Sequence, residues 1–149
     1  MRHKKIAVFL FSSVLVFSVL EQRASAEHPE DILVVANKTV PVDTITLPDL
    51  KQIFLKQRRQ WAGSRKVVPI NVKANDELRH RFRQALLKIT KAEEDNYWED
   101  QKIRNGLKEP PVFSNVLKAV FHLKGSIGYV YRKDFKEGVV KILTVIPAE

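Results

Sequence analysis

The N-terminal segment limits how much of this chain is left to fold. Basic side chains at Arg2, Lys4 and Lys5 precede the run Ile6–Leu20, which has no charged residue, and the small residues Ala24-Ser25-Ala26 follow. This order is typical of a secretory signal peptide and its cleavage site. The apolar run is shorter than the roughly 20 residues that span a bilayer as a helix. We therefore expect a signal peptide over residues 1–26 and one mature domain over residues 27–149, with an uncleaved membrane anchor as the alternative.

The composition excludes several kinds of site. The 149 residues contain no cysteine, so disulfides, cysteine-ligated metals, a thiol nucleophile and an acylated lipoprotein are excluded. The formal net charge of +9 would ordinarily raise the question of a nucleic-acid partner. Because an exported protein does not meet the DNA of the cell, we expect no nucleic-acid partner. The predicted location is the periplasm.

The mature chain alternates predicted strands with predicted helices. Residues 31–36 form an almost continuous apolar run, which suits a strand buried on both faces, as in a parallel sheet covered by helices. Shorter runs predict strands over 67–72, where Pro69 indicates an edge position, and over 126–131 and 139–146. Apolar periodicity predicts helices from Leu47, from Asn75 or Asp76 to about Lys88, from Thr90, and from Ser114 to Gly125. This order predicts an α/β fold, arranged as a three-layer sandwich.

Local signals at the helix starts make these predictions more specific. Thr46 is expected to cap the first helix, and Thr90 with Glu93 has the spacing of a capping box. In the helix after residue 75, the apolar residues would face the core. Its polar residues His80, Arg81 and Arg83 would point to solvent.

No set of residues in the mature chain has the spacing of a catalytic or metal-binding site. The histidines after residue 26 are not paired at ligand spacing, and Ser126 lacks the flanking glycines of a nucleophile elbow. The carboxylates after Thr90 suit the dipole of a helix N-terminus better than acid–base catalysis. The sequence therefore predicts a protein that is not an enzyme and that has no metal ion and no cofactor.

Basic residues gather at three places where they could hold an anion, because Arg, Lys and helix N-terminal amides bind phosphate and carboxylate. The alternative for each place is a solvated basic surface. The segment Gln101–Pro111, which carries one of the groups, is expected to be a polar loop. The groups are Arg58 and Arg59 near Trp61, Lys73 before the helix start at Asn75, and Lys102, Arg104 and Lys108 around Gly106.

Several segments, taken in order, resemble the phosphate-binding proteins of ABC transporters, within the periplasmic substrate-binding superfamily. The order extends over nearly the whole mature chain. The resemblance implies a periplasmic-binding-protein-like fold and a role in substrate binding. The matching segments are Leu33–Asn37, Leu47–Leu55 followed by Trp61 and Gly63, Val68–Asn71, the helix with Phe82, Tyr97-Trp98, Gly106, Pro110-Pro111 and Gly125–Val130.

Two features set this chain apart from full-length members of that family. Those members have two lobes that close over the ligand, whereas residues 27–149 correspond to little more than a single lobe. The family's phosphate-gripping stretch is an Arg followed by Gly-Ser-Gly-Thr, but the matching stretch here is Lys73–Arg79, with Asp76 and Glu77 at the helix start. Acidic side chains there would repel a dianion. The candidate ligand-binding residues are Asn37, Lys73, Asn75, Arg79 and Arg104.

Two hypotheses about function follow from the sequence. The first is an exported, non-enzymatic substrate-binding module that binds inorganic phosphate or another small anion weakly, with an ABC permease as the partner. The second is a ligand-free adaptor that docks on an envelope protein such as a sensor or a porin. Neither hypothesis includes a stable membrane anchor after cleavage.

Overall fold

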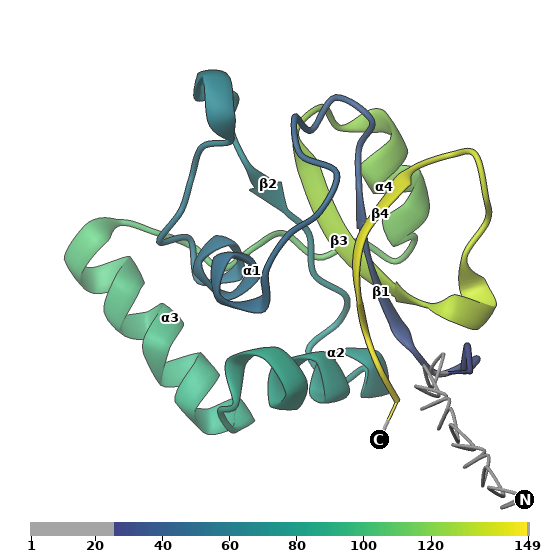
Figure 1. Ribbon diagram of the computed structural model, residues 1–149. Helices are drawn as coiled ribbons and strands as arrows, with labels where there is room; N and C mark the ends of the chain where they lie inside the picture. Colours follow the sequence, from purple (N-terminus) through teal and green to yellow (C-terminus); the bar gives the residue numbers. More distant parts are fainter. Residues whose placement is uncertain (1–25, 149) are drawn as a thin grey trace, which may run out of the picture.

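The computed structural model describes residues 26–148, in which helices cover both faces of a four-stranded sheet (Figure 1). The predicted α/β class and layered arrangement are confirmed. Nearly all of the predicted signal peptide lies outside the described residues. Within residues 26–148, none of the helices combines the length and the apolar character needed to cross a bilayer. The elements are β1 (Ile32–Ala36), α1 (Leu47–Phe54), β2 (Val68–Pro69), α2 (Glu77–Phe82), α3 (Lys91–Asn105), α4 (Val116–His122), β3 (Ser126–Tyr131) and β4 (Lys141–Ile146).

The sheet has the strand order β2-β3-β1-β4. Every residue of β1 is buried, as its apolar run predicts. The expected parallel setting is wrong for this strand, because β3 and β4 both run antiparallel to it and only β2 and β3 pair in parallel. An apolar run reports burial on both faces, but it carries no information on the direction of the neighbouring strands. The strand predicted over 67–72 is confirmed only over β2, which lies at the edge of the sheet, as Pro69 predicts.

Strand β3 separates the two helical layers. A Cβ on Gly128 would lie 2.6 Å from Val116 Cγ1, so α4 packs directly against this face of the strand. The next side chain, Tyr129, points to the opposite face, where its ring stacks on Phe82 at 3.7 Å between centroids and meets Phe54 edge-on at 5.6 Å. Because strand side chains alternate between faces, α1 and α2 cover one side of the sheet and α4 covers the other.

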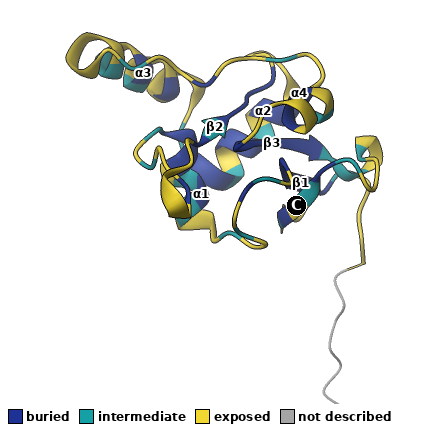
Figure 2. Ribbon diagram, turned by 90° about the horizontal axis from the view of Figure 1, so that it is seen from above, coloured by how far each residue is buried: buried dark blue, intermediate teal, exposed yellow. Residues whose placement is uncertain are grey.

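The caps at Thr46 and Thr90 follow the sequence closely, whereas the predicted end of the helix that begins after Thr90 is wrong. Thr46 accepts a hydrogen bond from the Asp49 amide, and Thr90 and Glu93 form both bonds of the capping box. Helix α3 continues through Asn105, so the first part of the predicted polar loop is helical. Gly106 ends it in the left-handed region at φ 64°, as glycine commonly does. The helix carries two buried residues and projects from the rest of the molecule (Figure 2).

The helix predicted from Asn75 or Asp76 begins after Asp76, and its second half differs from a regular α-helix. The stretch Arg83–Leu87 forms a π-helical turn that continues α2 and ends at Lys88 in the left-handed region. Helix α4 begins one residue later than expected, because Asn115 rather than Ser114 is its N-cap, and it ends at His122 instead of at Gly125.

Candidate ligand-binding site

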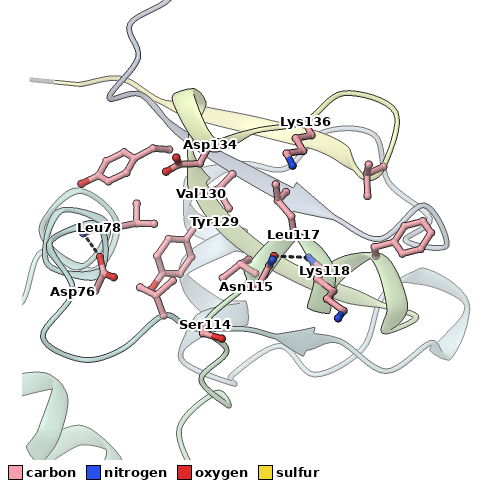
Figure 3. A pocket seen from close by; sticks show the side chains of 15 residues that line it. Asp76, Leu78, Ser114, Asn115, Leu117, Lys118, Tyr129, Val130, Asp134 and Lys136 are labelled. Carbon is pink, nitrogen blue, oxygen red and sulfur yellow. Dashed lines mark hydrogen bonds between the residues drawn. The ribbon is translucent and has the colours of Figure 1, made fainter.

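A cavity of about 620 Å³ opens between α2, α4 and the C-terminal half of β3 (Figure 3). Strand β2 pairs only with Ser126 and Ile127, so within the described residues the rest of that edge of β3 has no strand partner. The chain leaves β2 through Asn71 and Val72 and enters the loop before α2, which forms one wall. The first turn of α4 forms the opposite wall.

The helix starts that border the cavity are capped by their own side chains. The Asp76 carboxylate accepts a hydrogen bond from the Leu78 amide, and the Asn115 side chain accepts one from the Lys118 amide, each at 2.9 Å (Figure 3). N-cap side chains satisfy amide donors that a helix start otherwise leaves free. Both caps therefore use donors that could have bound an anion.

The charged residues on the cavity wall are of both signs. Asp76 and Asp134 contribute carboxylates, and Lys118 and Lys136 contribute ammonium groups. In Figure 3, Asp76 lies beside α2, and the two lysines lie on the far side of Val130 from it. Most of the remaining wall consists of aliphatic and aromatic side chains. The arrangement suits a ligand with an anionic end near the lysines and an apolar body, more than it suits a compact dianion.

Tyr129 contributes a neutral hydroxyl beneath this cavity. Its side chain is buried, and the hydroxyl donates a hydrogen bond to Asn71 Oδ1 at 3.0 Å. Burial raises the pKa of Tyr129, and the nearby positive charge of Arg79 offsets only part of that effect. The phenol therefore stays protonated and adds no charge to the cavity.

Two of the residues predicted from sequence lie next to the cavity. Val72 and Asp76 line the cavity. Lys73 and Asn75 lie between them in the loop, and both are exposed. Lys118 and Lys136 were not among the predicted residues. Lys118 lies in the first turn of a predicted helix, which could have marked it, but no local pattern near Lys136 indicates a site.

Asn37 and Arg104 lie elsewhere. The Asn37 side chain is buried and donates to the carbonyl oxygens of Val120 and Phe121 at 2.7 and 2.8 Å, at the C-terminal end of α4. Its Oδ1 accepts from the backbone and the hydroxyl of Thr39, so its hydrogen-bonding capacity is used within the fold. Arg104 is exposed on α3 and pairs with Asp100, one turn earlier.

Arg79 belongs to a buried ion-pair cluster rather than to an open site. It is 3% exposed and contacts Glu94 at 2.9 Å and Glu109 at 3.0 Å. Arg83, also 3% exposed, contacts the other oxygen of Glu94, so the prediction that Arg83 points to solvent is wrong. Burial lowers the pKa of Arg79, but the two glutamates outweigh burial, and the net pKa lies above its ordinary value. The shared carboxylate explains why two arginines are tolerated inside.

The structure thus brings Lys73 and Asn75 to one region and places Asn37, Arg79 and Arg104 away from it. A ligand role for any of the five stays a prediction. Among residues 26–148, no group of three histidine, aspartate or glutamate side chains is arranged to hold a metal ion.

Three solved structures of other proteins share the fold of this chain. An ABC-type phosphate transport receptor from Vibrio cholerae matches with a TM-score of 0.58 and 17% identity, over 75% of this chain and 44% of the receptor. PstS from Borrelia burgdorferi matches with a TM-score of 0.58 and 22% identity, over 76% of this chain and 46% of that protein. The chain has the fold of phosphate-transport binding proteins.

A third structure with this fold contains bound phosphate. The putative phosphate ABC transporter substrate-binding protein with bound phosphate from Clostridium perfringens matches with a TM-score of 0.56 and 16% identity, over 75% of this chain and 43% of that protein. The present chain spans less than half the length of all three proteins. No protein-family model and no curated protein matches the sequence.

Proposed function

We propose that this chain is an exported, non-enzymatic binding module that takes up a small anion weakly in the cavity between α2, α4 and β3. The observation that carries the proposal is the fold shared over three quarters of the chain with three proteins, two of which are named for phosphate transport. Those proteins are not named as enzymes, which supports a function in binding. The signal-peptide pattern in the sequence supports export to the periplasm.

The charges of the wall support weak binding and an organic anion rather than tight binding of phosphate. Lys118 and Lys136 attract an anion, whereas Asp76 and Asp134 on the same wall repel it. The ion-paired Arg79 is not free to contribute the bidentate contact that arginine makes with phosphate. A small carboxylate with an apolar body would contact both the lysines and the apolar wall. Inorganic phosphate would use only the lysines.

Lys73 and Asn75 are proposed to contact the ligand from the rim. They are exposed in the loop that forms the wall beside α2. An ABC permease is the partner that this proposal implies, because two of the three proteins with this fold are named for ABC transport. The ligand-free adaptor stays a hypothesis, since none of those three names points to such a role.

Isothermal titration calorimetry tests the proposal with phosphate, sulfate, acetate and benzoate. We expect dissociation constants in the millimolar range, with benzoate bound more tightly than acetate. Replacing Lys118 and Lys136 together by alanine should weaken benzoate binding by about tenfold, because both positive charges of the cavity wall are lost. The double substitution of Lys88 and Lys91 by alanine removes the same charge outside the cavity and should leave binding unchanged. Absence of heat and of a thermal shift at millimolar ligand would contradict the proposal.

A further inference from the structure

A second hollow, of about 360 Å³, lies beside β2 and shares no lining residue with the cavity between α2 and α4. Its floor is apolar and includes Pro69, Leu107 and Pro111. No acidic side chain lines it. We name it the cationic hollow after the four side chains Lys56, Arg58, Arg59 and Lys66 that line it.

A short hairpin holds the cations in place. Gln60 and Lys66 form an antiparallel bridge, and the Val67 amide donates to the Arg59 carbonyl at 2.9 Å. At the base of the hairpin, Trp61 is 3% exposed, and its Nε1 donates to the Gly125 carbonyl at 2.8 Å. Because the tryptophan fixes the hairpin to the start of β3, Arg59 and Lys66 are presented on an ordered surface.

The positive charges of the hollow are largely uncompensated. Asp49 lies 3.5 Å from Arg58, and Lys56 donates to the backbone carbonyl of Lys108 at 2.7 Å. Within residues 26–148, no carboxylate forms an ion pair with Arg59 or Lys66, and both are exposed. Burial and the charge of Lys66 lower the pKa of Lys56, and the negative charge of Glu109 offsets only part of that effect. An incoming anion would relieve the repulsion between the cations.

We propose that the cationic hollow binds an acidic peptide segment of a partner protein. Carboxylates of the segment would pair with Arg59 and Lys66, while an apolar side chain between them would cover the floor at Pro69. The segment is held through its side chains, because Pro69 has no N–H and the Val67 amide is already bonded, so β2 offers no donor for strand addition at these residues.

The shape of the hollow favours a peptide over two other anionic ligands. An inorganic anion would satisfy the cations and leave the apolar floor in water. The phosphate groups of a membrane or a nucleic acid would pair with the cations and would likewise leave the apolar floor uncovered. A short stretch with alternating acidic and aliphatic side chains matches both the charge and the floor.

Fluorescence anisotropy tests the proposal with a labelled peptide of alternating glutamate and leucine. The matched peptide carries glutamine in place of glutamate. We expect the acidic peptide to bind and the glutamine peptide not to bind. The charge reversal Arg59→Glu with Lys66→Glu should weaken binding by about tenfold or more. The control, Lys88→Glu with Lys91→Glu, makes the same change of net charge outside the hollow and should alter binding by less than about twofold.

The outcomes separate the proposal from its rivals. Circular dichroism and thermal melting establish that the Arg59 and Lys66 variant is folded, which is expected because both side chains are exposed. Equal binding by that variant and the control, or no binding by the native protein, would overturn the proposal. Tighter binding to vesicles of phosphatidylcholine and phosphatidylglycerol than to the peptide would also overturn it, in favour of a lipid surface. Since the two sites share no lining residue, either proposal can fail without the other.

Discussion

Arg79 and Arg83 carry the same charge as Arg59 in the hairpin after α1, but their surroundings are opposite. Arg79 and Arg83 are each 3% exposed and share the carboxylate of Glu94. Arg59 is exposed and pairs with no carboxylate in the described part of the chain. The contrast teaches that clustered basic residues in a sequence indicate an anion-binding site only where no carboxylate of the folded chain already pairs with them.

The buried cluster couples three parts of the chain. Glu94 lies on α3, Arg79 on α2 and Arg83 in the turn that follows, so the shared carboxylate joins the projecting helix to the layer beneath the sheet. Arg79 Nε and Arg83 Nη2 have no hydrogen-bond partner there. A cluster with incomplete hydrogen bonding depends strongly on the carboxylate that its two arginines share.

The largest effect is expected from Glu94→Gln. The substitution leaves two buried guanidinium groups without their shared carboxylate, and breaking such a pair costs about 3–5 kcal/mol. Urea denaturation followed by circular dichroism measures the change in the free energy of unfolding. The exposed pair of Asp95 with Lys91 provides the control, because Asp95→Asn should cost less than about 0.5 kcal/mol.

A triple variant separates charge burial from lost packing at this cluster. Replacing Arg79, Arg83 and Glu94 together by methionine or leucine removes every buried charge at once. Apolar replacements of buried ion clusters are often neutral or stabilising, so we expect stability near that of the native chain. If Glu94→Gln were as stable as the native chain, the buried cluster would not be the strong interaction that its geometry indicates.

Asp31 is intermediate between the buried cluster and the exposed cations, and its contribution to stability depends on pH. Its carboxylate accepts from the amides of Ala148 and His28 and pairs with Arg132, which is a quarter exposed. The backbone hydrogen bonds, followed by Arg132, hold the pKa of Asp31 below its ordinary value. The stabilisation is therefore complete above the unfolded-state pKa of about 3.9 and is lost as the pH falls through the lower native value.

We expect Asp31→Asn to destabilise the protein at pH 7 by less than Glu94→Gln does, because no deeply buried charge is left unpaired. Melting temperatures of the native and substituted chains, measured between pH 7 and pH 2, should converge at the acidic end. A difference between the two chains that grows on acidification would contradict the assigned role of Asp31.

The smallest change in stability is expected in the cationic hollow. Arg59→Ala with Lys66→Ala removes exposed charges that have no internal partner, so the free energy of unfolding should change by less than about 0.5 kcal/mol. Any change should be an increase at low ionic strength, because repulsion among the cations is relieved, and it should disappear at 1 M salt. Urea denaturation at two salt concentrations checks this. A loss of stability as large as that expected for Glu94→Gln would contradict the prediction, because it would mean that Arg59 and Lys66 stabilise the fold.

The parts of the fold that could be predicted from sequence are those that depend on neighbouring residues. The Thr90 capping box is set by residues three positions apart, and the apolar run of β1 reports its own burial. The direction of the strands beside β1 could not be predicted, because β3 and β4 lie about a hundred residues further along the chain. The end of α3 was predicted too early, although Gly106 was a visible stop signal for a helix.

The candidate site was harder to predict, for a physical reason that Arg79 illustrates. Its position in the matching stretch suggested a ligand contact, and only the fold shows that Glu94, fifteen residues away, faces it. Asn37 likewise looked available, yet its amide closes the end of α4 from more than eighty residues away. Lys118 and Lys136 line the same cavity only because the fold places α4 and the loop before β4 on its border.

The central proposal is that this chain binds a small organic anion in the cavity between α2, α4 and β3. Titration of the ¹⁵N-labelled protein with benzoate, followed by two-dimensional NMR, tests it most directly because each amide reports on its own surroundings. We predict progressive shifts at Val72, Asp76, Lys118 and Tyr129, all with the same millimolar midpoint. Shifts confined to the hairpin, or no shifts at millimolar benzoate, would contradict the account.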